Sequence, residues 1–404
     1  MNSSVLQRLL WVRGLRAFAD GYVSLLLPIY LLALGMTPLQ VGIIATGTLL
    51  GSGLLTLLVG LQAHRFTYRA RLLAASALMA GTGFGFAAFS DFWPLLVVAF
   101  VGTLNPSSGD VSVFLPLEHA VLSHSVGDRD RTALFARYSI VGAMVAAFGS
   151  LAAGLPEVMA TAMHISMRTA LQAMFGLYGA IGLVSSLIYR KLPADTGATP
   201  QAAASPLRKS KKVVYTLAAL FSLDALGGGL VVQSMLALWL FQTFQLSVLF
   251  TGALFFWTGL LSAFSYLIAV RVANRFGLIN TMVFTHLPSS ICLVLIPFTT
   301  SLSWAIALLL ARAVLSQMDV PTRSSYVMAI VPPNERAAAA SVTSVPRSLA
   351  SAVGPLLAGY LLGVSSFGWP LVIAGALKIT YDLLLLRSFR TLRAPEEVRP
   401  DGAE

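Results

Sequence analysis

Residues 23–34 read VSLLLPIYLLAL, an apolar run that carries no charge and shows no alternation of apolar and polar positions. About 20 mainly apolar residues span the hydrocarbon core of a bilayer, and residues 14–34 provide that length. In lipid every backbone amide must be paired within its own segment, which favours a helix, whereas a β-barrel would show alternating strands. The stretch therefore predicts a membrane-spanning helix.

The rest of the chain repeats this pattern. Of its 404 residues, 57% are hydrophobic and 11% are charged, whereas a soluble domain carries about a quarter charged residues. We therefore predict an all-α polytopic membrane protein with about twelve transmembrane helices. The predicted spans are residues 14–34, 41–62, 72–90, 93–118, 134–156, 168–189, 214–240, 247–270, 279–298, 302–330, 339–363 and 368–388.

Neither a removable leader nor an intrachain cross-link is expected from the sequence. No signal-peptide pattern precedes the first span, which we expect to be retained. The single cysteine, Cys292, excludes an intrachain disulfide.

The longest polar stretch lies near the middle of the chain. Residues 190–213 read RKLPADTGATPQAAASPLRKSKKV, a composition that cannot bury a core and predicts a flexible linker. It divides the chain into an N-terminal six-helix bundle at residues 1–189 and a C-terminal six-helix bundle at residues 214–392. A tail follows at residues 393–404.

The basic residues fall on one side of the predicted spans. Arg65, Arg69 and Arg71 follow the second span, Arg129 and Arg131 follow the fourth, and more lie in the linker and after the last span. Cytoplasmic loops carry such an excess, so we expect the linker and both termini to be cytoplasmic. Topology thus explains the formal net charge of +11, and no nucleic-acid partner is expected. The expected location is a cell membrane, the inner membrane of a bacterium.

The two halves of the chain resemble each other. The segment GLQAHRFTYRAR (60–71) corresponds to VRVANRFGLINT (270–281), with Arg-Phe at the same place. Asp20 in the first span matches Asp224 in the seventh, and Asp110 in the fourth matches Asp319 in the tenth. A parallel repeat of six spans is typical of a large class of secondary transporters.

On these residues the chain resembles the major facilitator superfamily over essentially its whole length. The family's signature after the second span, Gly-x-x-x-Asp-Arg-x-Gly-Arg-Arg, corresponds to residues 60–69, where His64 replaces the acidic residue and Thr67 replaces the glycine. The resemblance implies two six-helix bundles, one central site with alternating access, and a cytoplasmic gate. The predicted gate residues are His64, Arg65, Arg69, Glu118, Asp130, Arg131, Asn274, Arg275, Glu335 and Arg336.

Several ionisable residues lie inside predicted spans, where each costs several kcal/mol unless it is paired or hydrated. The resemblance implies that the first, fourth, seventh and tenth spans line the cavity, and Asp20, Asp110, Asp224 and Asp319 fall on these four. Carboxylates crowded around one cavity repel one another, which favours proton uptake. We therefore predict that one or more of them carry protons.

Arginines inside the predicted spans are the candidate partners of these carboxylates. Arg323, Arg347 and Arg137 are candidate site residues, and Arg323 and Arg347 are suited to bind an anionic solute. A structural role is the alternative, because residues four apart pair along one helix. We favour a functional role for Asp319–Arg323 and a structural one for Lys378–Asp382. His286 receives no role.

Backbone-breaking residues lie beside the acidic ones. Asn105-Pro106-Ser107-Ser108-Gly109 precedes Asp110, Gly227-Gly228-Gly229 follows Asp224, and Pro321 lies between Asp319 and Arg323. Irregular backbone at membrane depth is tolerated where it lines a cavity. The same residues are also common in ordinary transmembrane helices.

A methionine cluster offers a metal-binding alternative. Met159, Met163 and Met167, with His164, lie at helical spacing between the fifth and sixth spans. Thioether and imidazole groups suit copper(I), but methionine is also ordinary apolar filler, which we favour here. No metal site is therefore assigned.

The predicted function is transport driven by an ion gradient, with protons as the coupling ion and a small polar or charged molecule as the solute. The alternatives are a multidrug or metabolite exporter and a copper-type importer. No phosphate-binding loop or catalytic motif is present, so neither an enzyme nor a cofactor is expected. The expected partners are the solute, protons and the lipid bilayer, with the protein as a monomer.

Overall fold

The computed structural model describes residues 3–61, 66–107, 113–125, 128–193, 207–208, 210–332 and 335–389. Within these ranges the regular elements are all helices, which confirms the predicted all-α class. The chain forms two compact units. The first comprises Met1–Pro200, Val232–Leu260 and Pro355–Ser366, and the second comprises Gln201–Val231, Leu261–Gly354 and Phe367–Glu404.

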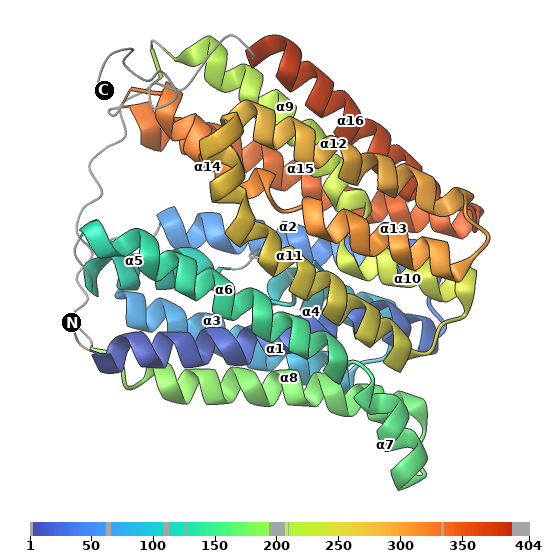
Figure 1. Cartoon of the computed structure of the whole chain (residues 1–404). Helices are drawn as coiled ribbons and strands as arrows, with labels where there is room; N and C mark the ends of the chain where they lie inside the picture. Colours follow the sequence, from blue (N-terminus) through green and yellow to red (C-terminus); the bar gives the residue numbers. More distant parts are fainter. Residues whose placement is uncertain are drawn as a thin grey trace, which may run out of the picture. The chain divides into compact units, whose positions relative to one another are not determined.

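In the first unit, α1 packs against α6 and α8, and α8 also packs against α3 (Figure 1). This unit contains α1 (Ser3–Ala33), α2 (Pro38–Leu61), α3 (Tyr68–Ala88), α4 (Phe92–Val101), α5 (Phe114–Ser125), α6 (Asp128–Ala152), α7 (Leu155–Met163), α8 (Met167–Tyr189) and α10 (Gln233–Phe244). It also includes the beginning of α11 (Val248–Phe276) and the end of α15 (Arg336–Val364).

In the second unit, α12 and α9 both pack against α16. This unit contains α9 (Lys211–Leu230), α12 (Leu278–Leu295), the 3₁₀ helix η1 (Ile296–Phe298), α13 (Leu302–Leu315), α14 (Asp319–Ile330) and α16 (Trp369–Phe389), with the remaining parts of α11 and α15. Its apolar core includes Leu217 and Phe221 of α9, Val283 of α12, Tyr326 of α14 and Leu385 of α16. Four buried ionisable residues each lie three positions along the chain from one of these core residues: Asp224, His286, Arg323 and Asp382.

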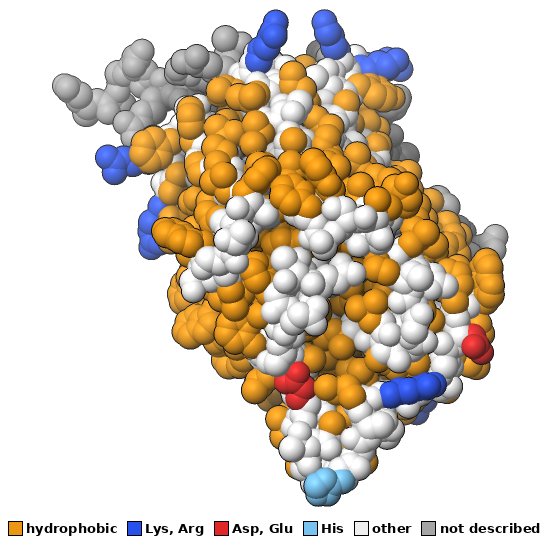
Figure 2. Space-filling view, turned by 90° about the vertical axis from the view of Figure 1, so that its right-hand side faces the viewer, with side chains coloured by type: hydrophobic (Ala, Val, Ile, Leu, Met, Phe, Trp, Pro, Cys, Tyr) orange, Lys and Arg blue, Asp and Glu red, His pale blue; other side chains and the backbone are white. Residues whose placement is uncertain are grey.

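The helices have the length and surface of membrane spans. Ten stretches are long and apolar enough to cross a membrane, among the residues that the structure describes. Two shorter apolar helices, α4 and α13, add to them. Large apolar side chains are exposed, such as Trp93 at 72% and Trp304 at 67%, and hydrophobic side chains predominate on the face in Figure 2. Exposed apolar surface of this extent belongs in lipid, so the chain is a multi-pass membrane protein.

Three of the predicted spans are each divided into two helices. The fourth is α4 and α5, the seventh is α9 and α10, and the tenth is α13 and α14. The breaks fall where the sequence has its glycines and prolines: α9 ends just after Gly227-Gly228-Gly229, and Pro321 lies in the first turn of α14, where its missing N–H costs no helical hydrogen bond.

The broken backbone of the fourth span finds its hydrogen-bond partners in neighbouring helices. The Thr103 N–H donates to Thr82 Oγ1 at 3.2 Å, and Tyr178 Oη donates to the Thr103 carbonyl at 3.0 Å. The Ser234 N–H donates to the Pro106 carbonyl at 3.1 Å. An irregular segment is stable at membrane depth only when its amides and carbonyls are satisfied in this way.

Close packing of α3 on α8 depends on glycine. A Cβ added at Gly83 of α3 would lie 2.2 Å from the Gly179 backbone nitrogen and 2.5 Å from its Cα. These are backbone atoms, which no side-chain rotation can move away. The two helices therefore approach to backbone contact, as small residues allow in membrane bundles.

Replacing Gly83 by alanine should destabilise the first unit, because α3 and α8 must then move apart. Overpacking of this kind costs about 1–3 kcal/mol. The measurement is the unfolding temperature of the detergent-purified protein, followed by intrinsic tryptophan fluorescence. Gly81→Ala on the same helix is the matched control, since its added Cβ would meet no atom within 4 Å. Equal unfolding temperatures for the two variants would contradict the close contact.

Candidate functional site

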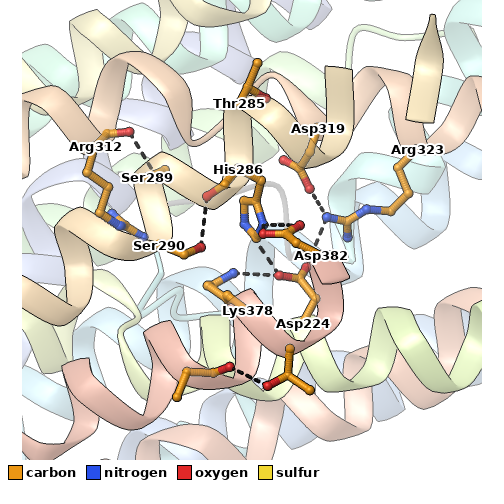
Figure 3. A network of polar contacts seen from close by, with 12 residues as sticks. Asp224, Thr285, His286, Ser289, Ser290, Arg312, Asp319, Arg323, Lys378 and Asp382 are labelled. Atoms are coloured by element: carbon orange, nitrogen blue, oxygen red, sulfur yellow. Dashed lines mark hydrogen bonds and ion pairs between the residues drawn. The ribbon is translucent and has the colours of Figure 1, made fainter. Parts of the chain in front are cut away.

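Asp224 of α9 is the centre of a buried charged network in the second unit (Figure 3). Its Oδ1 accepts a hydrogen bond from Lys378 Nζ of α16 at 2.7 Å, and its Oδ2 accepts one from Arg323 Nη2 of α14 at 3.0 Å. The residue is only 5% exposed. One carboxylate therefore ties together three helices by ion pairs with two cations.

Arg323 is shared between two carboxylates. Its Nη2 also donates to Asp319 Oδ2, one turn earlier on α14. Asp319 lies in the first turn of this helix, where the helix dipole favours a negative charge. The predicted pairing of Asp319 with Arg323 along one helix is thus present, and it extends across to α9.

His286 of α12 and Asp382 of α16 complete the network. His286 Nδ1 lies 3.0 Å from each oxygen of Asp382, and its Nε2 lies 3.6 Å from Asp224 Oδ1. Asp382 is fully buried and His286 is 4% exposed. Three carboxylates, two cations and one imidazole therefore share a buried space, in which Lys378 is the most exposed residue at 9%.

Aromatic rings border this network. The guanidinium of Arg323 lies 5.2 Å from the Phe221 ring centre and 6.0 Å from that of Tyr381, within cation–π range. Arg323 Nε and Nη1 and Tyr381 Oη are buried and have no hydrogen-bond partner among the described residues. Arg347 of α15 is exposed, and it interacts electrostatically with Arg323, Asp224 and Asp319. It adds a third cation near the site.

A separate buried network lies in the first unit. Arg16 of α1 forms an ion pair with Glu118 of α5, and Tyr138 of α6 donates to the same carboxylate oxygen. Tyr189, at the end of α8, donates to the other oxygen at 2.5 Å. Glu118 and Tyr189 are fully buried. Four helices are thus held by one carboxylate.

Of the remaining predicted site residues, two belong to the first unit and one falls outside the described residues. Asp20 lies half-buried on α1, one turn from Arg16, and Arg137 is exposed on α6. Asp110 falls outside the described residues. The network therefore brings together Asp224, Asp319 and Arg323 from the predicted set.

The predicted gate residues are only partly described. Glu335 is buried and accepts hydrogen bonds from the Ser210 N–H at 3.1 Å and from Ser210 Oγ at 2.5 Å. Arg275 and Arg336 are exposed, and Arg69 is half-buried. His64, Arg65 and the side chains of Asp130, Arg131 and Asn274 lie outside the described residues.

Sequence reasoning missed three members of the network. His286 received no role, and Lys378 and Asp382 were interpreted as a pair because they lie four residues apart. In the structure Lys378 instead bonds to Asp224, and Asp382 bonds to His286. A charged residue in each of two further apolar spans was the available signal, because such residues rarely stand alone in a membrane.

The methionine cluster lies at the end of α7 and in the turn that follows. Met163 is 63% exposed, and His164 ends the helix in a left-handed conformation with φ 54°. Glu157 of the same helix accepts hydrogen bonds from the N–H groups of Val248 and Leu249, at 2.6 and 3.1 Å. Among the described residues no group of three or more His, Cys, Asp and Glu side chains is arranged to hold a metal ion.

Comparison with known proteins identifies the fold. A family model described as Major Facilitator Superfamily matches residues 9–309 and 217–404. The chain is 26% identical over 418 residues to the uncharacterized membrane protein YJR124C of Saccharomyces cerevisiae, covering 95% of this chain and 93% of the yeast protein.

Solved transporter structures share the fold at low sequence identity. The nucleoside transporter NupG gives a TM-score of 0.72 at 13% identity, covering 96% of this chain and all of NupG. A bacterial homologue of the human lysosomal transporter Spinster, inward-facing and unoccupied, gives 0.74 at 16% identity, covering 97% and 98% of the two chains. The xylose transporter XylE from E. coli gives 0.67 at 13% identity, covering 97% and 99%.

Replacing Asp224 by asparagine should strongly destabilise the protein, because Arg323 and Lys378 would lose a buried counter-charge. Breaking a buried ion pair on one side costs about 3–5 kcal/mol. The unfolding temperature in detergent measures this loss. Asp91→Asn is the matched control, since Asp91 is exposed and makes no side-chain cap hydrogen bond. The unfolding temperature of the double variant Asp224→Asn with Lys378→Met should fall by less than the sum of the decreases in the two single variants. Decreases that simply add would contradict the ion pair.

Replacing Tyr189 by phenylalanine should destabilise the first unit, because Glu118 Oε1 would lose its phenolic donor. A buried acceptor left unsatisfied costs about 1–3 kcal/mol. Tyr215→Phe is the control, since Tyr215 is 54% exposed. The same thermal measurement applies, and an unchanged unfolding temperature for Tyr189→Phe would show that the hydrogen bond to Glu118 contributes nothing.

Proposed function

Because the chain belongs to the Major Facilitator Superfamily, we propose that it moves a small polar or charged solute across a membrane by alternating access, coupled to protons. Members of this family and the structural neighbours are transporters, so the protein is a membrane transporter and not an enzyme. To this family assignment our proposal adds the coupling ion and the class of solute.

The buried network around Asp224 is the observation that carries the proposal. Ionisable groups in a bilayer are costly, and in membrane proteins they mark solute or proton pathways. If the network served only to stabilise the fold, apolar residues could take its place, because replacing a buried ion pair by apolar residues of similar volume often costs no stability. Six buried ionisable groups on four helices therefore support a role in moving charge.

The proposed topology has twelve spans in two six-helix bundles, residues 1–189 and 214–392. The divided helices α4–α5, α9–α10 and α13–α14 then count as the fourth, seventh and tenth spans. Discontinuous helices commonly form the central sites of secondary transporters. Both termini and the linker are proposed to be cytoplasmic, in the inner membrane of a bacterium, with the protein as a monomer.

Polar contacts at the cytoplasmic loops are the proposed gate. Glu335 would contribute by holding Ser210, which precedes α9, and Glu118 by joining α1, α5, α6 and α8. The remaining proposed gate residues lie at positions 64–69, 130–131 and 274–275, and Arg336 follows Glu335.

The content of the site supports a polar solute over an apolar drug. Arg323 has two unpartnered buried nitrogens, and Arg347 lies nearby and exposed. Guanidinium groups bind carboxylate or phosphate through paired hydrogen bonds. NupG and XylE, which share the fold, are transporters of nucleosides and of xylose, which are polar molecules.

A solute screen in proteoliposomes with an imposed pH gradient tests the proposal. The parent protein should accumulate or expel at least one polar solute in response to the gradient. Asp319→Asn should reduce this flux by about tenfold or more, because Arg323 loses one of its two counter-charges and the proton pathway is disturbed. Asp91→Asn should match the parent. Flux that is equal in the parent and in Asp319→Asn would remove the role proposed for Asp319.

A further inference from the structure

The contacts of His286 and Asp382 distinguish them from the rest of the network. Asp224 forms ion pairs with Arg323 and Lys378, and Asp319 forms one with Arg323. The partners of these two carboxylates are thus a guanidinium and an ammonium group. Among the described residues, the hydrogen-bonding partner of Asp382 is His286. The negative charge of Asp382 is therefore compensated directly only when the imidazole holds an additional proton.

The orientation of the His286 ring fits that protonated form. Its Nδ1 faces Asp382 at 3.0 Å, and its Nε2 faces Asp224 Oδ1 at 3.6 Å. A neutral imidazole has one N–H group and one lone pair, whereas the imidazolium ion donates from both nitrogens. In the neutral form one nitrogen would direct its lone pair at a carboxylate oxygen. A doubly protonated ring satisfies both contacts (Figure 3).

The charge balance leads to the same conclusion. Within the set of groups joined by ion pairs, three carboxylates and two cations leave one negative charge when His286 is neutral, and a proton on His286 cancels it; Arg347 forms no ion pair with this set among the described residues. An uncompensated charge in a low-dielectric site is strongly unfavourable. The other titratable or charged groups on elements around the pair are Tyr381 on α16, Arg347 on α15, and Arg312 and Cys292, which lie beside each other on α13 and α12. None of these forms an ion pair with Asp382 among the described residues.

We propose that the coupling proton resides on the His286–Asp382 pair, and not on Asp224 or Asp319, which form ion pairs with Arg323 and Lys378. This assignment rests on the proposed proton-coupled function and places the proton away from the four aspartates predicted to carry it. Binding forms one N–H bond on the imidazole with a proton taken from water, and release breaks that bond and returns the proton to water. Histidine is the residue type most often used to take up and release protons in proteins.

Loss of the proton from His286 would affect the packing of the helices around the pair. Asp382 would then be a fully buried carboxylate facing a neutral ring, between helices that pack against each other. Lys378 lies one turn away on α16 but is bonded to Asp224. Any rearrangement that gives Asp382 a new cation must therefore change contacts between α9, α12 and α16. Proton release and helix packing are linked through this one residue.

Nitrogen NMR of the full-length protein, labelled with ¹⁵N-histidine in lipid nanodiscs, tests the proton site without any solute. His286→Gln identifies the resonances of His286 by their loss. In the parent they should convert between imidazolium and neutral forms within pH 5–9. In Asp382→Asn the imidazolium fraction at pH 6 should fall about threefold or more, because the facing carboxylate is gone. Asp91→Asn should leave it unchanged.

Two results would overturn the assignment: a His286 ring that keeps one protonation state throughout this pH range, or an imidazolium fraction that Asp382→Asn does not alter. Because Asp382→Asn retains the histidine, the test holds even where His286→Gln folds poorly.

Transport supplies the second readout, with the solute that the proteoliposome screen identifies. In His286→Gln the accumulation ratio should fall about tenfold or more and lose its dependence on the imposed pH gradient, since the titrating group of the pair is missing. Cys292→Ser, on the same helix, should behave as the parent does. Gradient-dependent accumulation that persists in His286→Gln would overturn the assignment and leave the proposed function standing. A His286 ring that titrates as expected in a protein with no gradient-driven flux would support the proton site and refute the function.

Discussion

The double ion pair at Asp224 is the interaction on which the second unit depends. The Asp224 carboxylate accepts hydrogen bonds from Arg323 and Lys378. It therefore holds α9, α14 and α16 together at the place where these three charged side chains are buried. Each of these charges would be prohibitively costly alone, because desolvation of an ion in a low-dielectric site amounts to several kcal/mol. The packing of the three helices and the neutralisation of the charges are therefore one requirement, and the apolar core one turn away is arranged around it.

The sequence was sufficient for the helical class and for part of the site. Apolar length predicts the membrane helices, and a spacing of four residues predicts the Asp319–Arg323 pair, since both depend on local geometry. Cross-helix partners are different, because no local rule says which faces of two distant helices meet. Arg16 illustrates this: Asp20 is four residues away on the same helix, but the ion pair forms with Glu118, 102 residues later. Lys378 and Asp382 were mispaired for the same reason.

Apolar length also conceals the breaks within spans. The stretch 302–330 is long enough for one continuous helix, and its one proline, Pro321, is only moderately informative, because proline occurs in many intact transmembrane helices. Whether a break is stable depends on partners for the freed backbone groups. Around the fourth span these are the hydroxyls of Thr82 and Tyr178 and the N–H of Ser234. They come from three other helices, so only the assembled fold reveals that the broken form is satisfied.

The two buried networks differ in one chemically decisive respect. Glu118 receives a guanidinium and two phenolic donors, all groups that keep their protons near neutral pH, so its environment is constant. The network of the second unit likewise has carboxylates held by side chains from several helices, but one of those side chains is the imidazole of His286. A clamp of fixed donors can only hold helices together, whereas a clamp with one titratable donor holds them with a strength that depends on the proton. The two units thus contain similar buried networks, and the histidine on α12 is the feature of the second that a proton-coupled mechanism of the kind we propose would use.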